Sequence, residues 1–402
     1  MKAAIKSIEA KAVNYLLRHI PRTKTSDVFS PSVESAQDEV EDIFTSSSGT
    51  KIPVLKHHRY SLKKCWSVFG PVAGLSELKG KGLLSEDDQK YLKDVIGHRT
   101  ITDSFMNIRA RLTPYVEKYS NLFVTTTIPD IGKRLLKPSL ETAETLISKK
   151  TVQHRALIEK INGLVTGKKI SGQDKILEIG YTSGGESIIG FERLGFQAFG
   201  IDNFYYDSVK STSRHEIIRD LTKTKVTFDV GDITTRTGYE EDSLALVYSL
   251  SVIEHIADLP AAFDEMFRIL RPGGVMFHRY DPFFHIGGAH SHASLDSPWA
   301  HMRMNDDDLE HYIRLYRPNE AEVSLPWIKN ALNRRHTTNY IQNAVSKAGF
   351  KIRLWDVEYV SDAHRALLTP DIISDCLIQN DNITIADLCG KAVSFIAEKP
   401  AK

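Results

Sequence analysis

Three acidic residues in the middle of the chain have the spacing of a nucleoside-binding site. Glu178 lies near the end of a short apolar run, and Asp202 and Asp232 follow the next two runs. A carboxylate in the position of Asp202 can accept hydrogen bonds from both ribose hydroxyls of a nucleoside. A carboxylate in the position of Asp232 can accept one from an adenine amino group. The three residues therefore predict a site for one adenosine-containing ligand.

A glycine-rich segment connects the first of these runs to a helix pattern. It contains Gly180, Gly184 and Gly185. Glycines at such a turn let a ligand approach the backbone closely, and the start of the following helix offers free N–H groups. Twenty-four residues separate Glu178 from Asp202. This pair alone fits either a dinucleotide or another adenosine ligand.

The elements that must position these residues alternate along the chain. Apolar and β-branched runs lie at residues 175–179, 197–201, 225–230, 244–249 and 274–279, each separated from the next by a helix-length segment. This pattern predicts βαβ units in a parallel sheet that is covered on both faces. A helix at 337–348 and strands at 351–359 and 391–397 complete an α/β, doubly wound fold. The acidic residues should then lie along the carboxyl edge of the sheet.

Two further segments indicate which protein family the chain resembles. The sequence SLSVIEH occupies residues 249–255, after the fourth strand, and RPGG occupies residues 271–274, before the fifth. With these features the chain resembles the class I S-adenosylmethionine-dependent methyltransferases, and more closely the broad type 11 group, over about residues 152–280 and 334–398. The resemblance implies a Rossmann-like sheet of seven strands and S-adenosyl-L-methionine as cofactor, and the residue pattern before it predicts a helical N-terminal region.

The resemblance also implies a cofactor-binding set at the ends of strands one to four. Its members are Glu178, Gly180, Thr182, Gly184, Asp202, Asp232, Ile233 and Ser249. The first four would form the methionine and ribose side of the pocket, with Thr182 in place of the middle glycine of the family motif. Asp202 would bind the ribose hydroxyls, and Asp232 with Ile233 would contact the adenine.

Histidines supply the candidates for catalysis. Methyl transfer to a hydroxyl needs in-line alignment and a base, and histidine suits the role of base near neutral pH. His255, just past the fourth strand, and His290 are the two predicted bases. For His255 a structural role as a helix cap is an equal alternative. The predicted reaction is O-methylation of a small molecule or a glycan.

His290 belongs to a histidine-rich insert over residues 280–333. Six histidines lie between residues 278 and 311: His278, His285, His290, His292, His301 and His311. With Asp281 and the acidic residues 306–308, some of them have the ligand types of a divalent metal site. No metal is assigned, because the acidic residues fit a helix N-terminus and the spacing is not that of a dedicated site. The insert is predicted to be a lid over the acceptor.

The remaining predictions concern domains and partners. We expect a helix and flexible linker over residues 1–50, a helical accessory region over 51–150, and the methyltransferase domain over 151–400. The chain has 52 Lys and Arg against 51 Asp and Glu, which argues against a nucleic-acid binder. No apolar run is long enough to span a membrane. Three scattered cysteines favour the cytoplasm.

The expected partner is a small-molecule or sugar acceptor, and the oligomeric state, a homo-oligomer included, stays open. Two other classes of function also remain open. An NAD-dependent oxidoreductase would use the same ribose-binding acid, Asp202. A non-catalytic scaffold protein that binds S-adenosylmethionine would need only the pocket.

Overall fold

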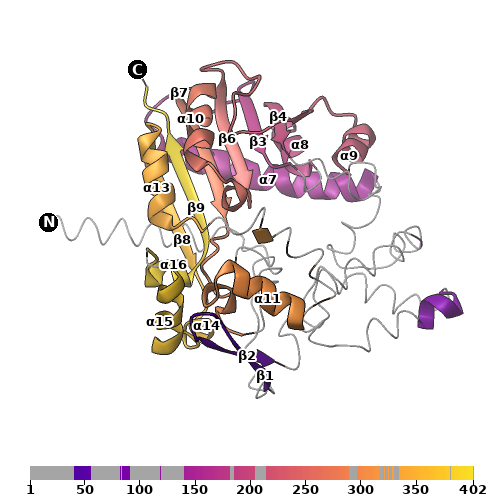
Figure 1. Ribbon diagram of the computed structural model, residues 1–402. Coiled ribbons are helices and arrows are strands. Elements are labelled where there is room, and N and C mark those ends of the chain that lie inside the picture. Colours follow the sequence, from indigo (N-terminus) through magenta and orange to yellow (C-terminus); the bar gives the residue numbers. More distant parts are fainter. Residues whose placement is uncertain are drawn as a thin grey trace.

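A mostly parallel sheet is the centre of the molecule (Figure 1). The computed structural model describes residues 40–55, 82, 84–90, 118, 140–181, 185–203, 214–288, 297–316, 318, 321, 325, 328–329, 335–380 and 382–401. The sheet has seven strands in the order β5-β4-β3-β6-β7-β9-β8. Their bounds are β3 Lys175–Ile179, β4 Gln197–Asp202, β5 Thr227–Val230, β6 Leu244–Leu250, β7 Leu270–Tyr280, β8 Lys351–Tyr359 and β9 Gly390–Glu398.

The strand order reverses at one point along the carboxyl edge of the sheet. β3, β4, β5, β6 and β7 pair in parallel, and β9 is antiparallel to both of its neighbours. From β3 the chain first builds outward through β4 and β5, and then returns to add β6 on the other side of β3. Ligands of such sheets bind where the order reverses. The predicted doubly wound sheet of seven strands is therefore confirmed, and its reversal point lies between β3 and β6.

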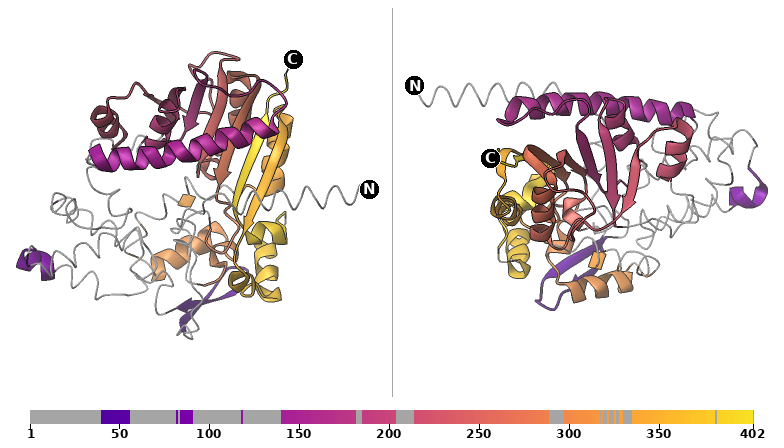
Figure 2. Two further views of the ribbon diagram at one scale, coloured as in Figure 1. Left: turned by 180° about the vertical axis from the view of Figure 1, so that it is seen from behind. Right: turned by 90° about the horizontal axis from the view of Figure 1, so that it is seen from above.

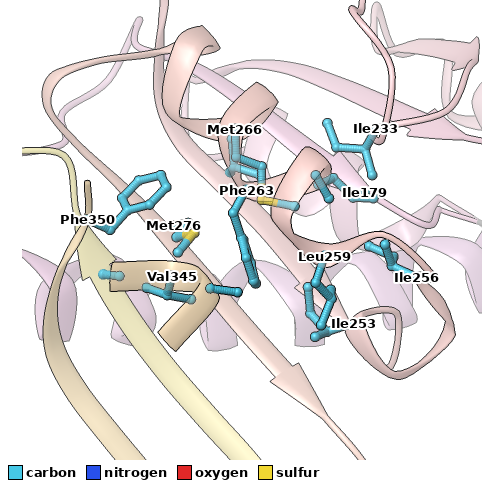
Figure 3. Close-up of a cluster of buried hydrophobic side chains, with 14 of the residues drawn as sticks. Ile179, Ile233, Ile253, Ile256, Leu259, Phe263, Met266, Met276, Val345 and Phe350 are labelled. Carbon is cyan, nitrogen blue, oxygen red and sulfur yellow. The ribbon is translucent and has the colours of Figure 1, made fainter. Parts of the chain in front are cut away.

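Helices cover both faces of the sheet, as the two views of Figure 2 show. On one face lie α7 (Leu140–Leu164), α8 (Glu186–Glu192) and α9 (Arg214–Thr222), and on the other lie α10 (Leu259–Ile269) and α13 (Thr338–Lys347). Figure 3 shows the second face, where Phe263 and Met266 of α10 and Val345 of α13 pack with Met276 of β7. Each face thus has its own apolar core.

Helix α7 crosses the domain boundary that the sequence suggested at residue 150. It is continuous over 25 residues, and no Gly or Pro occurs in it before Gly163. Ala143, Ile147, Ile158 and Ile161 are buried in the core that α8 shares. The helix therefore packs with the sheet domain along most of its length.

A third apolar core lies beyond the carboxyl edge of the sheet, and we call the structure around it the cap. It combines a hairpin of β1 (Val40–Thr45) and β2 (Lys51–Leu55), the insert with α11 (Asp306–Tyr316), and the helices α14 (Asp362–Arg365), α15 (Pro370–Gln379) and α16 (Ile385–Cys389). The chain leaves β7 at Tyr280 and enters this core at Phe283 and Phe284. Figure 1 shows the cap below the sheet.

The hairpin corrects part of the sequence prediction. Residues 40–45 were expected in a flexible linker and residues 51–55 in a helical region, but both are strands. The reason is a long-range contact, because Phe44, Ile52 and Val54 are buried in one core with described residues of the insert such as Trp299 and Tyr312. Asp308 of α11 accepts hydrogen bonds from the N–H and hydroxyl of Ser47, at 2.9 and 2.8 Å. A local sequence pattern cannot show such a partner.

Buried polar contacts hold the cap segments together. The Arg303 guanidinium lies 2.8 Å from the Asp375 carboxylate and donates to the carbonyl oxygen of Lys51 at 3.0 Å. One side chain thus links the insert, α15 and the hairpin. Within the described ranges, no helix is long and apolar enough to cross a bilayer.

Candidate functional site

The site is built around a close contact between two turns at the reversal point. Gly180, directly after β3, has φ +77°, and a Cβ added to it would lie 2.4 Å from Cγ2 of Val252. Val252 belongs to the segment that follows β6. The N–H of Gly180 also donates to the carbonyl oxygen of Ile201 at 2.8 Å. Gly180 is therefore required both for its backbone conformation and for its lack of a side chain.

Two of the predicted acidic residues meet at this point. Glu178 of β3 pairs with Gly200 of β4, two residues before Asp202, and both carboxylates are buried. Burial raises the pKa of Glu178 to about 7, and the charges of Glu186 and Asp202 add to the increase, whereas a hydrogen bond from Ser187 and the charge of Lys150 oppose it. When ionised, the Glu178 carboxylate would attract a cationic group bound beside it.

The third acidic residue lies next to Asp202. The N–H of Gly231 donates to the carbonyl oxygen of Asp202 at 2.9 Å, which holds the turn after β5 against the end of β4. Oδ1 of Asp232 accepts from the N–H and the hydroxyl of Thr234, at 2.9 and 2.8 Å. Ile233 is buried and lies near Ile179 in Figure 3. The structure thus brings Glu178, Asp202 and Asp232 to one edge, in strand order.

A polar network behind Glu178 was missed by the sequence analysis. His154 of α7 places Nε2 at 3.1 Å from both the hydroxyl and the carbonyl oxygen of Ser187, and its ring stacks on Phe191 at 3.7 Å. Burial lowers the pKa of His154 to about 3, so it is neutral near pH 7. Ser187 in turn donates to Glu178. No local signal marks His154, because its partners come from another helix.

The side chain of Ser249, a predicted cofactor-binding residue, points into the sheet. It is fully buried, and its hydroxyl lies 2.6 Å from Nδ1 of His278, its partner across β6 and β7. Burial lowers the pKa of His278 to about 3. The Ser249 side chain is therefore part of the sheet interior, and His278 is a neutral core residue.

The segment after β6 carries the predicted base and a carboxylate that the sequence analysis overlooked. His255 ends the short helix η2 (Ile253–His255), is half-buried, and its backbone N–H donates to Val252 at 2.9 Å. Glu254 beside it is buried, and the N–H of Asp281, after β7, donates to Glu254 Oε1 at 3.3 Å. Glu254 and Asp281 follow the fourth and fifth predicted strands. The search for acidic residues at strand ends, which identified the first three carboxylates, could therefore have found them as well.

The other predicted residues do not form a cluster in the described part of the chain. Thr182, Gly184 and His290 lie outside the described residues. His301 is buried in the cap, where Nε2 lies 3.0 Å from the carbonyl oxygen of Phe283, and burial lowers its pKa to about 4. Among the residues that the structure describes, no group of three or more His, Cys, Asp or Glu is placed to hold a metal ion.

Comparisons with known proteins agree with this geometry. Residues 144–353 match a family model described as a methyltransferase domain. A phosphoethanolamine N-methyltransferase of Triticum aestivum is 36% identical over 100 residues, which are 25% of this chain and 19% of that protein. Phosphoethanolamine N-methyltransferase 1 of Zea mays is 30% identical over 120 residues, 30% of this chain and 22% of that protein. The chain thus spans about a fifth of the length of these relatives.

One solved structure that resembles the chain is phosphoethanolamine N-methyltransferase 2 of Haemonchus contortus in complex with S-adenosyl-L-methionine. Its identity to this chain is 17%, and the TM-score is 0.38. The match covers 70% of this chain and 60% of that one.

The contact between Gly180 and Val252 predicts a specific stability effect. Gly180→Ala should lower the free energy of unfolding by about 2 kcal/mol or more, because an L-residue is strained at this φ and its Cβ must displace Val252. Adding Val252→Ala should recover part of the loss. Urea unfolding measures both effects.

Gly163 of α7 provides the matched control, since nothing lies within 4 Å of an added Cβ there. Gly163→Ala should raise stability by about 0.5 kcal/mol. Equal effects at Gly163 and Gly180 would contradict the proposed contact.

Proposed function

The chain belongs to the methyltransferase-domain family of class I S-adenosylmethionine-dependent methyltransferases, and we propose that it transfers the methyl group of S-adenosylmethionine to a small polar molecule. S-adenosylmethionine is the methyl donor of this family. The family match agrees with the resemblance found in the sequence. It covers the residues that form β3 to β7, and therefore the reversal point of the sheet.

The observation that carries the proposal is the row of carboxylates beside the Gly180 turn. In this proposal Asp202 binds the ribose hydroxyls and Glu178 the methionine amino group. Asp232 has one oxygen bound by Thr234, so its other oxygen would accept from the adenine amino group, beside Ile233. The sulfonium would then face the segment after β6, because Val252 contacts the same turn.

The cofactor supplies an activated methyl group, and this chain must align the acceptor and take up its proton. The sequence favours an oxygen acceptor, with His255 as the base. His255 lies in the segment that contacts the Gly180 turn and is half-buried, which leaves it accessible to an acceptor. A nitrogen acceptor is the second candidate. It is favoured by the names of the relatives and by the buried Glu254 beside His255.

Calorimetry with S-adenosylhomocysteine tests the pocket. Asp202→Ala should weaken binding about 10- to 100-fold, because two ribose hydroxyls lose their acceptor. Asp220→Ala, an exposed carboxylate on α9, should leave affinity unchanged. If the unaltered protein does not bind S-adenosylhomocysteine at millimolar concentration, the assignment of the pocket is wrong. Tighter binding of NAD would instead support the oxidoreductase alternative.

The raised pKa of Glu178 predicts that cofactor affinity depends on pH. A carboxyl group that titrates near pH 7 is protonated below that pH and then attracts the methionine ammonium group less strongly. Affinity for S-adenosylhomocysteine should therefore fall about tenfold from pH 8 to pH 6. Glu178→Gln should bind weakly at both pH values, and its affinity should not change with pH in this range. An unchanged pH dependence in this variant would assign the titration to another group.

The role of His255 is tested by turnover. His255→Ala should lower the transfer of labelled methyl groups from S-adenosylmethionine into a small-molecule extract of the host by about 100-fold or more, which is the usual contribution of a general base. Its affinity for S-adenosylhomocysteine should stay the same. His311→Ala, on the exposed side of α11, is the control. Full turnover by His255→Ala would leave His255 with only a structural role.

A further inference from the structure

We infer that Glu254 and Asp281 form a binding site for the cationic amino group of an amine acceptor. The inference rests on the proposed methyl transfer and selects the nitrogen acceptor, the second candidate above, over the oxygen acceptor. It is carried by two carboxylates just past the ends of two adjacent strands, the buried Glu254 and the half-buried Asp281, and by one oxygen of Glu254 that has no hydrogen-bond partner among the described residues.

The pair lies on the same edge of the sheet as the cofactor turn. Leu250, the last residue of β6, is paired with Arg279 of β7, so the segments that leave the two strands begin side by side. Glu254 is four residues past Leu250 and Asp281 is two past Arg279. Val252, between Leu250 and Glu254, contacts Gly180. A group bound by the pair would therefore lie next to the crevice between β3 and β6.

The two carboxylates are linked through the backbone and by a hydroxyl. The N–H of Asp281 donates to Oε1 of Glu254 at 3.3 Å, and the hydroxyl of Ser251 donates to Oδ2 of Asp281 at 3.4 Å. Glu254 is only 5% exposed, and its Oε2 is buried without a hydrogen-bond partner among the residues that the structure describes. Buried acceptors are rarely left unpaired, because each costs about 1–3 kcal/mol. A cationic donor that ionises Glu254 and hydrogen-bonds to Oε2 would remove this cost.

The surrounding charges place a proton on Glu254. Burial raises the pKa of both carboxyls, and the charge of Asp281 raises that of Glu254 further. The charge of Arg279 lowers the pKa of both carboxyls. Arg279 lies 3.5 Å from Asp281 and 3.7 Å from Glu358, and Lys391 lowers the pKa of Asp281 while Glu358 raises it. These shifts favour a proton on Glu254 over one on Asp281.

Two other titratable residues lie near Glu254. Tyr280 is buried, and burial raises its pKa, so it remains a neutral phenol. His255 is the next residue in the chain and is the proposed base for an oxygen acceptor. An ammonium group supplies what the pair lacks, a positive charge and N–H donors directed at Oε2. A hydroxyl group supplies no charge and would leave the proton in place.

The transfer step balances with this pair as the proton acceptor. One proton of the bound ammonium group passes to the ionised carboxylate, which frees the nitrogen lone pair. The lone pair forms a bond to the methyl carbon, the bond from that carbon to sulfur breaks, and its electrons stay on sulfur. The products are an N-methylated ammonium ion, S-adenosylhomocysteine and a protonated carboxyl.

Infrared difference spectroscopy on the full chain loaded with S-adenosylhomocysteine tests the site without knowledge of the acceptor. At neutral pH the protein should show a buried protonated carboxyl band that Glu254→Gln lacks and the surface variant Glu240→Gln retains. Methylammonium chloride should remove this band, because the bound cation ionises Glu254. Potassium chloride at the same concentration should not. Asp281→Asn should lower the pKa of Glu254, and the band should then disappear at a lower pH, because the variant removes the neighbouring charge.

Turnover provides the second measurement. Labelled methyl transfer should occur to small primary amines in preference to alcohols with the same carbon skeleton, and Glu254→Gln should lower it by about 100-fold with S-adenosylhomocysteine affinity unchanged. A band that methylammonium leaves intact, or that potassium removes equally, would overturn the amine site. So would transfer to the alcohols alone. Failure to bind S-adenosylhomocysteine would overturn the proposed function itself, and calorimetry distinguishes that result.

Discussion

The close approach of Val252 to Gly180 is the constraint on which the site depends. It joins the turn after β3 to the segment after β6, the two sides of the crevice where the strand order reverses. Because no side chain fits between them, residues proposed for the cofactor and residues proposed for the acceptor occupy one small region. Parallel strands bring Asp202 and Asp232 to the same edge, so the fold itself arranges the carboxylates.

The cap adds a second level of organisation, since it is assembled from segments that are far apart in the sequence. Arg303 of the insert contacts both Asp375 and the backbone of Lys51, and Phe44 packs against Tyr312 at 5.4 Å between ring centroids. The family match begins at residue 144 and ends at residue 353, so it includes neither the hairpin nor α15. These cap segments therefore lie outside the matched region.

The sequence predicted the sheet well because its signals are local. The strands at residues 175–179 and 351–359 were predicted with the bounds that the structure shows, and the acids at Glu178, Asp202 and Asp232 follow from strand ends. The hairpin was missed because its apolar side chains find their partners some 250 residues away. Ser249 was assigned to the cofactor because of its position at a strand end, whereas its hydroxyl contacts His278 across the sheet. Burial and cross-strand contacts of this kind cannot be derived from spacing alone.

A crystal structure of the protein with S-adenosylhomocysteine tests the central claim most directly. The nucleoside should lie in the crevice between β3 and β6, with its ribose on Asp202, its adenine beside Ile233 and its sulfur directed toward residues 252–255. Electron density for the ligand at any other edge, or a ribose that contacts none of the three carboxylates, would contradict the account.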